Sequence, residues 1–270
     1  MPSLEERNVA ALSIWHNEMA ANRQFDLGPG LLAPSGYNQH THEGVRTFTP
    51  ANFGELLAPR LSRRPRFRYD TLEIVARGDR VAGLWRTEEL NDERSPLSQL
   101  GIYRLEDGKI AESWYTSRHS DADPWPNAPR PREQWSIASS EALTPDEEAN
   151  LATFNLWNDI RYNRSNDFEA IAELITNPLV IHGTSGTQTI PAAEVVRNAA
   201  AFAERYPGFT ASSDDLFVVG DRAAKRFCYR YSEPSPERGS LQCGVAIYRF
   251  ENHRLAEYWQ VNLPLDVDWG

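Results

Sequence analysis

Two stretches of the sequence decide the fold: GIYRLEDGKIAESWYTSRHSDADPW at residues 101–125 and AIYRFENHRLAEYWQVNLPLDVDWG at residues 246–270. They align at an offset of 145 (246 − 101). The identical pairs include Ile102/Ile247, Tyr103/Tyr248, Arg104/Arg249, Ala111/Ala256, Glu112/Glu257, Trp114/Trp259, Asp121/Asp266 and Asp123/Asp268. Matches in one order at one offset indicate that the chain contains the same unit twice.

The beginnings of the two halves align as well, at an offset of 142 (157 − 15). The matches are Trp15/Trp157, His40/His182 and the turns Gly78-Asp79-Arg80/Gly220-Asp221-Arg222. The difference between the two offsets is one short insertion. We expect it in the loops near Asn91–Pro96 and Glu233–Gly239.

A proline-rich segment separates the halves. Pro124, Pro126, Pro129 and Pro131 interrupt regular structure and stiffen the path of the chain. We therefore predict a first domain at 1–125, a linker at 126–142 and a second domain at 143–270. A chain of 270 residues is long enough for two cores.

The predicted elements have the same order in both halves. Helix starts are expected at Ser3 and at Thr144-Pro145, each followed by acids and by apolar residues at helical spacing. A second helix is expected from Asp167 to Ile175, and glycines with Pro29 shorten or remove its counterpart. A short strand with His40 or His182, a helix after Pro50 or Pro191, and three long strands joined by tight turns complete each half. This order predicts an α+β fold.

The chain resembles the SnoaL-like domains of the NTF2-like superfamily. GYNQHTHEGVRTF (36–48) and GKIAESWYTS (108–117) are similar to that family's patterns, and LVIHGTSG (179–186) and HRLAEYWQVN (253–262) repeat them more loosely. The resemblance implies two tandem cones, in which a curved, mostly antiparallel sheet wraps around helices and leaves a pocket. It also implies an intrachain pseudo-dimer, with a further homo-oligomer left open.

The family resemblance further implies acid–base chemistry without cofactor, as in polyketide cyclases, ketosteroid isomerase and scytalone dehydratase. Family cyclases carry an Asp about four residues after the terminal Trp, where this chain has Arg118 and Leu263. We expect His119 and Asp121 to replace it, and the alternative is that they belong to an exposed tail.

Two histidines are the first catalytic candidates, because the repeat places a His at one position twice. His40 and His182 are expected on a pocket-facing strand, where imidazole exchanges a proton near neutral pH. The alternative is a core histidine bonded to a carbonyl group. If the strand continues, His42 shares a face with His40 and contributes to substrate binding. Nothing completes a ligand set, so we expect no metal and no cofactor.

Aromatic residues are expected to line the pockets and to bind a small hydrophobic or aromatic molecule. An ordinary core is the alternative. The candidates are Trp15, Tyr37, Trp85, Tyr103 and Trp114 in the first half, and Trp157, Tyr162, Tyr229 and Trp259 in the second.

Composition excludes several classes of protein. The net charge of −10 argues against a nucleic-acid partner, and we expect the basic run Arg60–Arg68 to be a solvated loop and strand edge. No apolar run is long enough for a membrane helix. The N-terminus does not resemble a signal peptide, so we expect a cytoplasmic protein in which Cys228 and Cys243 are reduced core residues.

These observations favour a cofactor-independent cyclase, isomerase, dehydratase or hydrolase acting on a cyclic or polyketide-like substrate. The alternative is a non-catalytic small-molecule-binding or scaffold protein.

Overall fold

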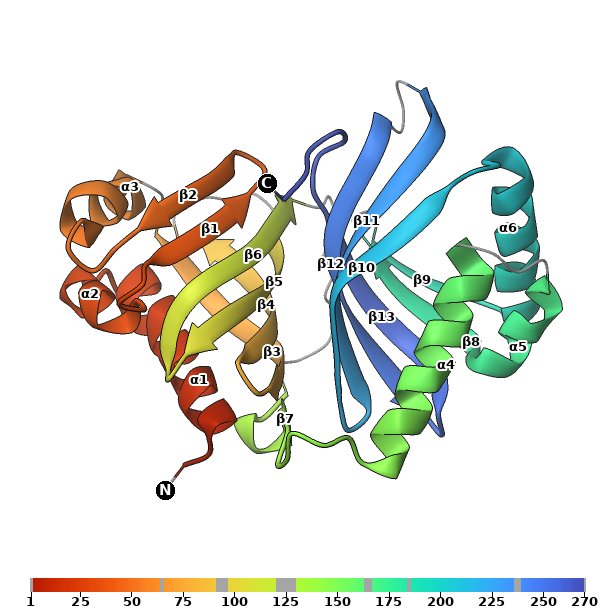
Figure 1. The fold of residues 1–270 in the computed structure, drawn as a ribbon, viewed down its shortest axis with the longest axis horizontal. Coiled ribbons are helices and arrows are strands. Elements are labelled where there is room, and N and C mark those ends of the chain that lie inside the picture. The colour runs from red at the N-terminus through yellow and green to blue at the C-terminus, as the bar shows by residue number, and fades with distance from the viewer. Residues whose placement is uncertain are drawn as a thin grey trace. The chain divides into compact units, whose positions relative to one another are not determined.

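The computed structural model describes residues 2–63, 66–90, 97–119, 130–162, 167–183, 186–235 and 239–269. The chain divides into two compact units. Unit 1 comprises residues up to Glu141 together with the C-terminal Trp269, and unit 2 comprises Ala142–Asp268. Each is an α+β unit built on its own sheet (Figure 1).

Unit 1 has a mixed seven-stranded sheet in the order β2-β1-β6-β5-β4-β3-β7. Its strands are β1 (Tyr37–Thr41), β2 (Gly44–Phe48), β3 (Phe67–Arg77), β4 (Arg80–Glu89), β5 (Leu97–Glu106), β6 (Lys109–His119) and β7 (Ser136–Ile137). Its helices are α1 (Leu4–Ser13), a π-helix at Ile14–Ala21, α2 (Gly28–Leu31), a second π-helix at Phe53–Leu57 and α3 (Ala58–Arg63). The central strands are antiparallel, whereas β1 runs parallel to β6.

Unit 2 has a mixed six-stranded sheet in the order β10-β11-β12-β13-β8-β9. Its strands are β8 (Ile175–Gly183), β9 (Gly186–Ile190), β10 (Thr210–Val219), β11 (Arg222–Ser235), β12 (Gly239–Glu251) and β13 (Arg254–Asn262). Its helices are α4 (Pro145–Tyr162), α5 (Ile171–Leu174) and α6 (Ala192–Arg205). As in unit 1, the antiparallel meander is extended by a parallel pair, β13 with β8.

The same hydrogen bonds tie the first helix of each unit to a tight turn. The Asn8 side-chain amide donates to the Gly78 carbonyl at 2.9 Å, and Asn150 donates to Gly220 at 2.9 Å. The N–H groups of these two glycines donate in turn to Glu5 and Glu147. The tandem repeat read from the sequence is therefore present in three dimensions, down to individual side chains.

The α+β prediction and the order of elements are confirmed, with three differences. The second helix is equally short in both units: a three-residue 3₁₀ turn followed by a four-residue helix, α2 in unit 1 and α5 in unit 2. The expected contrast between a helix from Asp167 to Ile175 and a shortened counterpart in unit 1 is therefore wrong. The short histidine strand belongs to a hairpin in each unit, with β2 and β9 as the additional strands. The basic run Arg60–Arg68 begins in a helix, because α3 extends to Arg63. The prediction of a loop is therefore wrong for residues 60–63.

The apolar core of each unit lies between the sheet and its helices. In unit 1 it joins Trp15, Tyr37, Trp85 and Tyr103 to the aliphatic residues of α1 and the meander. In unit 2 the helix residues Phe154 and Trp157 pack on the strand residues Phe227 and Tyr248. Apolar burial on this scale is the main favourable term in folding.

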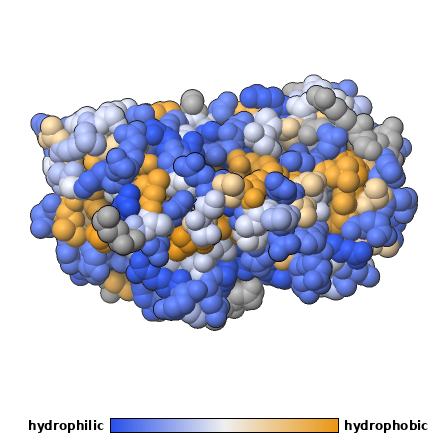
Figure 2. Space-filling model, turned by 60° about the horizontal axis from the view of Figure 1, so that its bottom comes forward, coloured by the Kyte–Doolittle hydropathy of each residue, from blue (hydrophilic) through white to orange (hydrophobic). Residues whose placement is uncertain are grey.

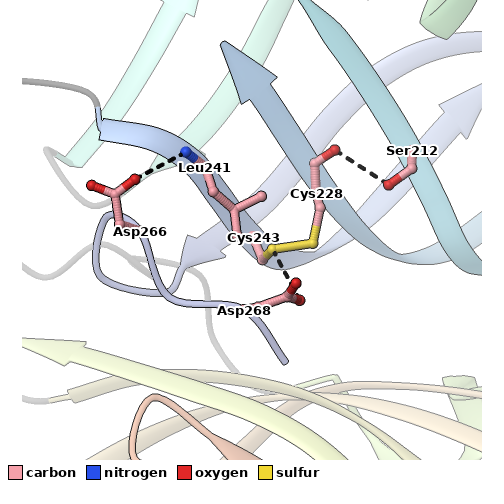
Figure 3. The surroundings of a disulfide bond; sticks show 6 residues. All are labelled: Ser212, Cys228, Leu241, Cys243, Asp266 and Asp268. Carbon is pink, nitrogen blue, oxygen red and sulfur yellow. Dashed lines mark hydrogen bonds between the residues drawn. A yellow bond between two sulfur atoms is a disulfide. The ribbon is translucent and has the colours of Figure 1, made fainter. Parts of the chain in front are cut away.

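The two cysteines of unit 2 form a disulfide, so the expectation of free thiols is wrong. Cys228 on β11 and Cys243 on β12 are directly opposed in the strand register and their sulfur atoms are bonded (Figure 3). The Asp268 carboxylate lies 3.9 Å from the Cys243 sulfur, and Asp266 accepts the Leu241 N–H. These contacts hold the C-terminal segment of unit 2 against β12.

Polar residues cover much of the face drawn in Figure 2, with groups of hydrophobic residues between them. The large apolar side chains that are exposed come from separate elements: Ile14, Val45, Leu56, Leu90 and Leu156. Scattered apolar residues of this kind are normal on a protein surface. Within the described residues, no helix has the length and apolar character needed to cross a membrane.

Candidate functional site

The helical segment at the start of unit 1 places a histidine among core residues. Leu12, Trp15, His16 and Met19 follow the i, i+3, i+4, i+7 spacing of one helix face, and all four are buried. The last three lie in the π-helix at Ile14–Ala21. π-Helical turns are rare and are frequently found at functional sites. His16 therefore points at the interior from a segment with unusual geometry.

Aromatic rings enclose the His16 imidazole. It stacks on the Trp85 indole with 4.4 Å between centroids, and the Tyr69 and Tyr103 rings lie within 5.7 Å. Its Nε2 atom is 3.1 Å from the Tyr103 hydroxyl. Burial in this apolar environment lowers the pKa of His16 to about 3, because desolvation penalises the imidazolium ion. The imidazole is thus neutral at physiological pH.

A cavity of about 90 Å³ opens beside His16. Its lining comes from the first helical segment, from α3 and from the inward rows of the sheet: Trp15, His16, Met19, Ala20, Gln39, Leu61, Phe67, Tyr69, Thr87, Leu97, Gln99, Tyr103, Tyr115 and Ser117. None of these described residues is an acid, a lysine or an arginine. The pKa of Tyr103 is raised, above all by burial. The pocket therefore offers neutral hydrogen-bonding groups among aromatic rings at pH 7.

The predicted aromatic residues of unit 1 occupy three kinds of position. Trp15 and Tyr103 line the cavity. Tyr37 and Trp85 are fully buried in the core outside that lining. Trp114 does not reach the cavity, because its neighbour Tyr115 occupies the inward position on β6. Its prediction as a pocket residue is wrong.

The expectation that His40 faces the pocket is also wrong. Side chains alternate along a strand, and on β1 the inward positions belong to Tyr37 and Gln39. His40 lies on the other face of the sheet, where its ring stacks on Trp114 with 5.0 Å between centroids. From this position the His40 side chain does not reach the cavity beside His16.

His40 belongs instead to a charged cluster on that face. Its Nε2 atom is 2.9 Å from Glu112 Oε1, and Glu112 also accepts from Arg104 Nε at 3.1 Å. Its Nδ1 atom is 2.7 Å from the carbonyl oxygen of Trp269. Both ring nitrogens of His40 therefore lie within hydrogen-bond distance of an oxygen atom.

Unit 2 repeats this cluster and shows the same correction for His182. The His182 Nε2 atom is 2.7 Å from Glu257, which accepts from Arg249 Nε at 2.8 Å. The ring stacks on Trp259 with 5.1 Å between centroids, so neither residue faces the interior as predicted. Burial opposes ionisation of Glu257, but the bonds from His182 and Arg249 outweigh it and hold its pKa below the usual value.

The other predicted aromatic residues of unit 2 point into its interior. Trp157 packs on Tyr162 with 5.6 Å between centroids, and Tyr162 packs on Tyr229 at 5.1 Å. Burial is also the main cause of the raised pKa of Tyr229. All three belong to the apolar core of the unit or pack against it. Their role in ligand binding remains a prediction.

Three predicted residues of unit 1 lie elsewhere. His42 is exposed in the turn between β1 and β2, so it does not share a strand face with His40 and the expected alignment of the two rings is wrong. The His119 side chain and Asp121 lie outside the described residues. Their catalytic role remains a prediction.

The sequence analysis did not single out His16 or Lys225, whose imidazole and amine are both buried. His16 occupies a polar position in an otherwise apolar helical stripe, which is a readable signal. Lys225 occurs in an alternating strand row with Ala223, Phe227 and Tyr229, three core residues. In both cases the spacing of the neighbouring apolar residues predicts a buried position. Burial of an imidazole or an amine costs free energy because the group loses its hydration.

Comparisons with known proteins relate a part of the chain to a family. The sequence model described as SnoaL-like domain matches residues 153–258. An NTF2-like protein of unknown function from Mesorhizobium loti is 23% identical, with 46% of this chain and 98% of that chain covered and a TM-score of 0.38. An LEH-like epoxide hydrolase from M. tuberculosis is 8% identical, with 44% and 85% covered and a TM-score of 0.37. No curated protein matches the chain.

Proposed function

The model of the SnoaL-like domain matches residues 153–258, and unit 1 repeats the order of elements of unit 2. From this premise we propose that unit 1 is a second NTF2-like unit and a cofactor-independent acid–base enzyme. Its substrate is a small, largely hydrophobic cyclic ketone of polyketide type. The reaction is a proton transfer next to the carbonyl group, as in cyclisation, isomerisation or dehydration. The Tyr103 hydroxyl donates a hydrogen bond to the carbonyl oxygen, and His16 supports that bond.

The His16–Tyr103 pair carries this proposal. The two groups are 3.1 Å apart and fully buried, and burial keeps both neutral at pH 7. When the imidazole donates from Nε2 to the phenol oxygen, the phenol proton is available to a substrate oxygen. A neutral donor held in an apolar site stabilises an enolate strongly, because no solvent has to reorganise.

The remaining lining supports this class of substrate. The rings of Trp15, Phe67 and Tyr115 suit a flat hydrocarbon skeleton. Gln39 and Gln99 add amide groups for substituent oxygens. A molecule with one charged group would lack a counter-ion among the described lining residues, so we propose a neutral substrate.

The proton acceptor is proposed from the sequence. His119 and Asp121 follow the pocket residue Ser117 along the chain, and either has the chemistry of a general base. Asp121→Asn and His119→Ala are therefore expected to slow the reaction and to leave ligand affinity unchanged.

The test is hydrogen–deuterium exchange at the α-carbon of small cyclic ketones, from cyclohexanone to 1-tetralone, followed by NMR. The full chain is expected to accelerate exchange over buffer, and Tyr103→Phe to reduce the rate by about 10²–10³, the usual cost of a lost oxyanion donor. Tyr115→Phe is the matched control, because Tyr115 lines the same cavity, whereas the hydrogen bond of His16 Nε2 is to Tyr103. Equal losses in both variants would contradict the assigned role of Tyr103.

A non-catalytic binding protein is the second candidate. It is favoured by the lack of a carboxylate among the described lining residues. This candidate predicts ketone binding, seen as a change in tryptophan fluorescence that Trp15→Phe reduces, with α-exchange no faster than in buffer. That result would contradict the enzyme proposal and support a binding protein.

A further inference from the structure

A lysine amine is buried in the core of unit 2. Lys225 lies on β11, where alternation places it in one row with Ala223, Phe227 and Tyr229. The residue is 0% exposed. Lysine is almost never fully buried without a charged partner, so this position calls for a physical explanation.

The contacts of the amine are polar on one side and aromatic on the others. Nζ donates to Asn158 Oδ1 at 2.6 Å. It lies 5.4 Å from the Phe154 ring centroid, 6.0 Å from that of Tyr162 and 5.5 Å from that of Phe227. Among the described residues no carboxylate forms an ion pair with it. One of the three ammonium donors is therefore satisfied by a conventional acceptor.

This environment disfavours the ammonium ion. Burial lowers the pKa of Lys225 to about 7, and the more distant Asp214 charge compensates only in part. A large share of the side chain is then a neutral amine at pH 7, with a lone pair on nitrogen. Desolvated lysines of this kind act as nucleophiles toward carbonyl carbon.

We propose that Lys225 is the reactive amine of a second site, in unit 2, that takes small aromatic or cyclic aldehydes and ketones as imines. This site is independent of the pocket of unit 1. Asn158 accepts one N–H and so orients the lone pair, and the Phe154, Tyr162 and Phe227 rings receive the ring of the ligand.

The step balances without a cofactor. The Nζ lone pair forms a bond to the carbonyl carbon, and the resulting carbinolamine loses its oxygen as water. Both protons of that water come from the amine nitrogen. The product is a C=N bond, and water reverses it.

The sequence makes this proposal simple to test, because Lys225 and Lys109 are the chain's two lysines. The full-length protein is incubated with benzaldehyde and sodium cyanoborohydride at pH 7, and peptides are mapped by mass spectrometry. Lys225 is expected to be benzylated at least about tenfold faster than Lys109, since an ordinary lysine with a pKa near 10.4 is almost fully protonated there. Lys109→Arg leaves Lys225 as the remaining lysine and is expected to keep its rate.

The pH dependence separates the proposal from incidental labelling. The Lys225 rate is expected to reach a plateau above about pH 7, whereas the Lys109 rate continues to rise beyond pH 9. In 6 M guanidinium chloride the two rates should become equal. Native labelling of Lys225 that is no faster than that of Lys109 would overturn the proposal and identify Lys225 as an inaccessible structural cation.

Discussion

Each unit has a titratable nitrogen group in the middle of its aromatic core. In unit 1 a helix supplies this group, whereas in unit 2 a strand of the sheet supplies it. In unit 1 it is the imidazole of His16, from the helix, and the sheet has Gly83 at the position that corresponds to Lys225. In unit 2 the corresponding helix residue is Asn158, and the sheet supplies Lys225. Both pairs match at the offset of 142 that aligns the two halves.

The neighbouring rings explain why the two solutions are not interchangeable. In unit 1 the Trp85 ring lies over Gly83, and a Cβ atom added there would come within 2.1 Å of it. In unit 2 the residue corresponding to Trp85 is the smaller Phe227, whose ring lies beside the Lys225 amine. The two units therefore share one scaffold, but the residues at these interior positions differ together, because the size of one side chain limits its neighbour.

The other face of each sheet shows the opposite behaviour. The histidine, glutamate, arginine and tryptophan cluster is retained in both units with nearly the same stacking distance. Retention of all four members in both copies is what a structural cluster predicts. Functional divergence is therefore to be sought in the interiors.

The largest expected effect concerns the disulfide, which unit 2 has and unit 1 lacks. The residues opposed at the corresponding register of unit 1 are Arg86 and Ser98. Replacing Cys228 and Cys243 by alanine is expected to lower the free energy of unfolding of unit 2 by about 3 kcal/mol, the loop-closure value for about 15 residues. Hydrogen-exchange mass spectrometry reads each unit separately. An unchanged exchange pattern in unit 2 would contradict this.

The pH dependence of unit 1 follows from His16. Its folded pKa is lowered to about 3, whereas an unfolded histidine titrates near 6.5. Between these values the unfolded chain binds a proton that the folded chain does not, so stability falls as the pH drops. At pH 4.5 the loss is of the order of 2–3 kcal/mol.

His16→Asn, which copies the residue found in unit 2, is the matched variant for this test. It is expected to remove the loss, as measured by chemical unfolding of both proteins from pH 7 to pH 4.5. Parallel pH curves for the two proteins would show that His16 is not the responsible group.

Lys225 gives unit 2 a different pH dependence. Its folded pKa is about 7 and the unfolded value is near 10.4, so the stability of unit 2 rises between these pH values. Lys225→Met is expected to stabilise unit 2 by about 2 kcal/mol at pH 7, because a buried amine whose charged form is disfavoured is replaced by an apolar side chain. Thermal unfolding at pH 7 and pH 9 checks this. A destabilised variant would show that the amine contributes favourable contacts that exceed its desolvation cost.

The smallest expected effect tests the coupling of Gly83 with Trp85. Gly83→Ala is expected to destabilise unit 1 by about 1–2 kcal/mol through overpacking. Gly54→Ala is the control, since nothing lies within 4 Å of a Cβ atom there. Adding Trp85→Phe to Gly83→Ala, as in unit 2, should restore part of the loss. If urea unfolding shows no recovery of stability in the double variant, Gly83 and Trp85 are not coupled as the comparison with unit 2 implies.

Much of the fold was predictable from the sequence, because local chemistry and repetition specify it. The aligned ends, the helix caps, the tight turns and the strand periodicity predict two α+β units. They do so correctly, but the second helix is equally short in both units, so Gly28, Pro29 and Gly30 do not shorten it in unit 1 relative to unit 2.

The site was predictable in part. The sequence identified Trp15 and Tyr103, which do line the cavity, but it directed attention to His40 and His182, which face away from it. Whether a strand residue points inward depends on a register difference of one position, and the hairpin that fixes this register was not visible in the pattern.

The sequence by itself thus determined the duplication, the fold class and the chemical types of residue available to each half. Only the tertiary structure decided which of them meet: His16 with Tyr103 in one interior, Lys225 with Asn158 in the other, and the two cysteines in a disulfide. The physical reason is that these contacts join side chains from separate elements, and packing and strand register set their distances. The composition of either element alone does not encode them.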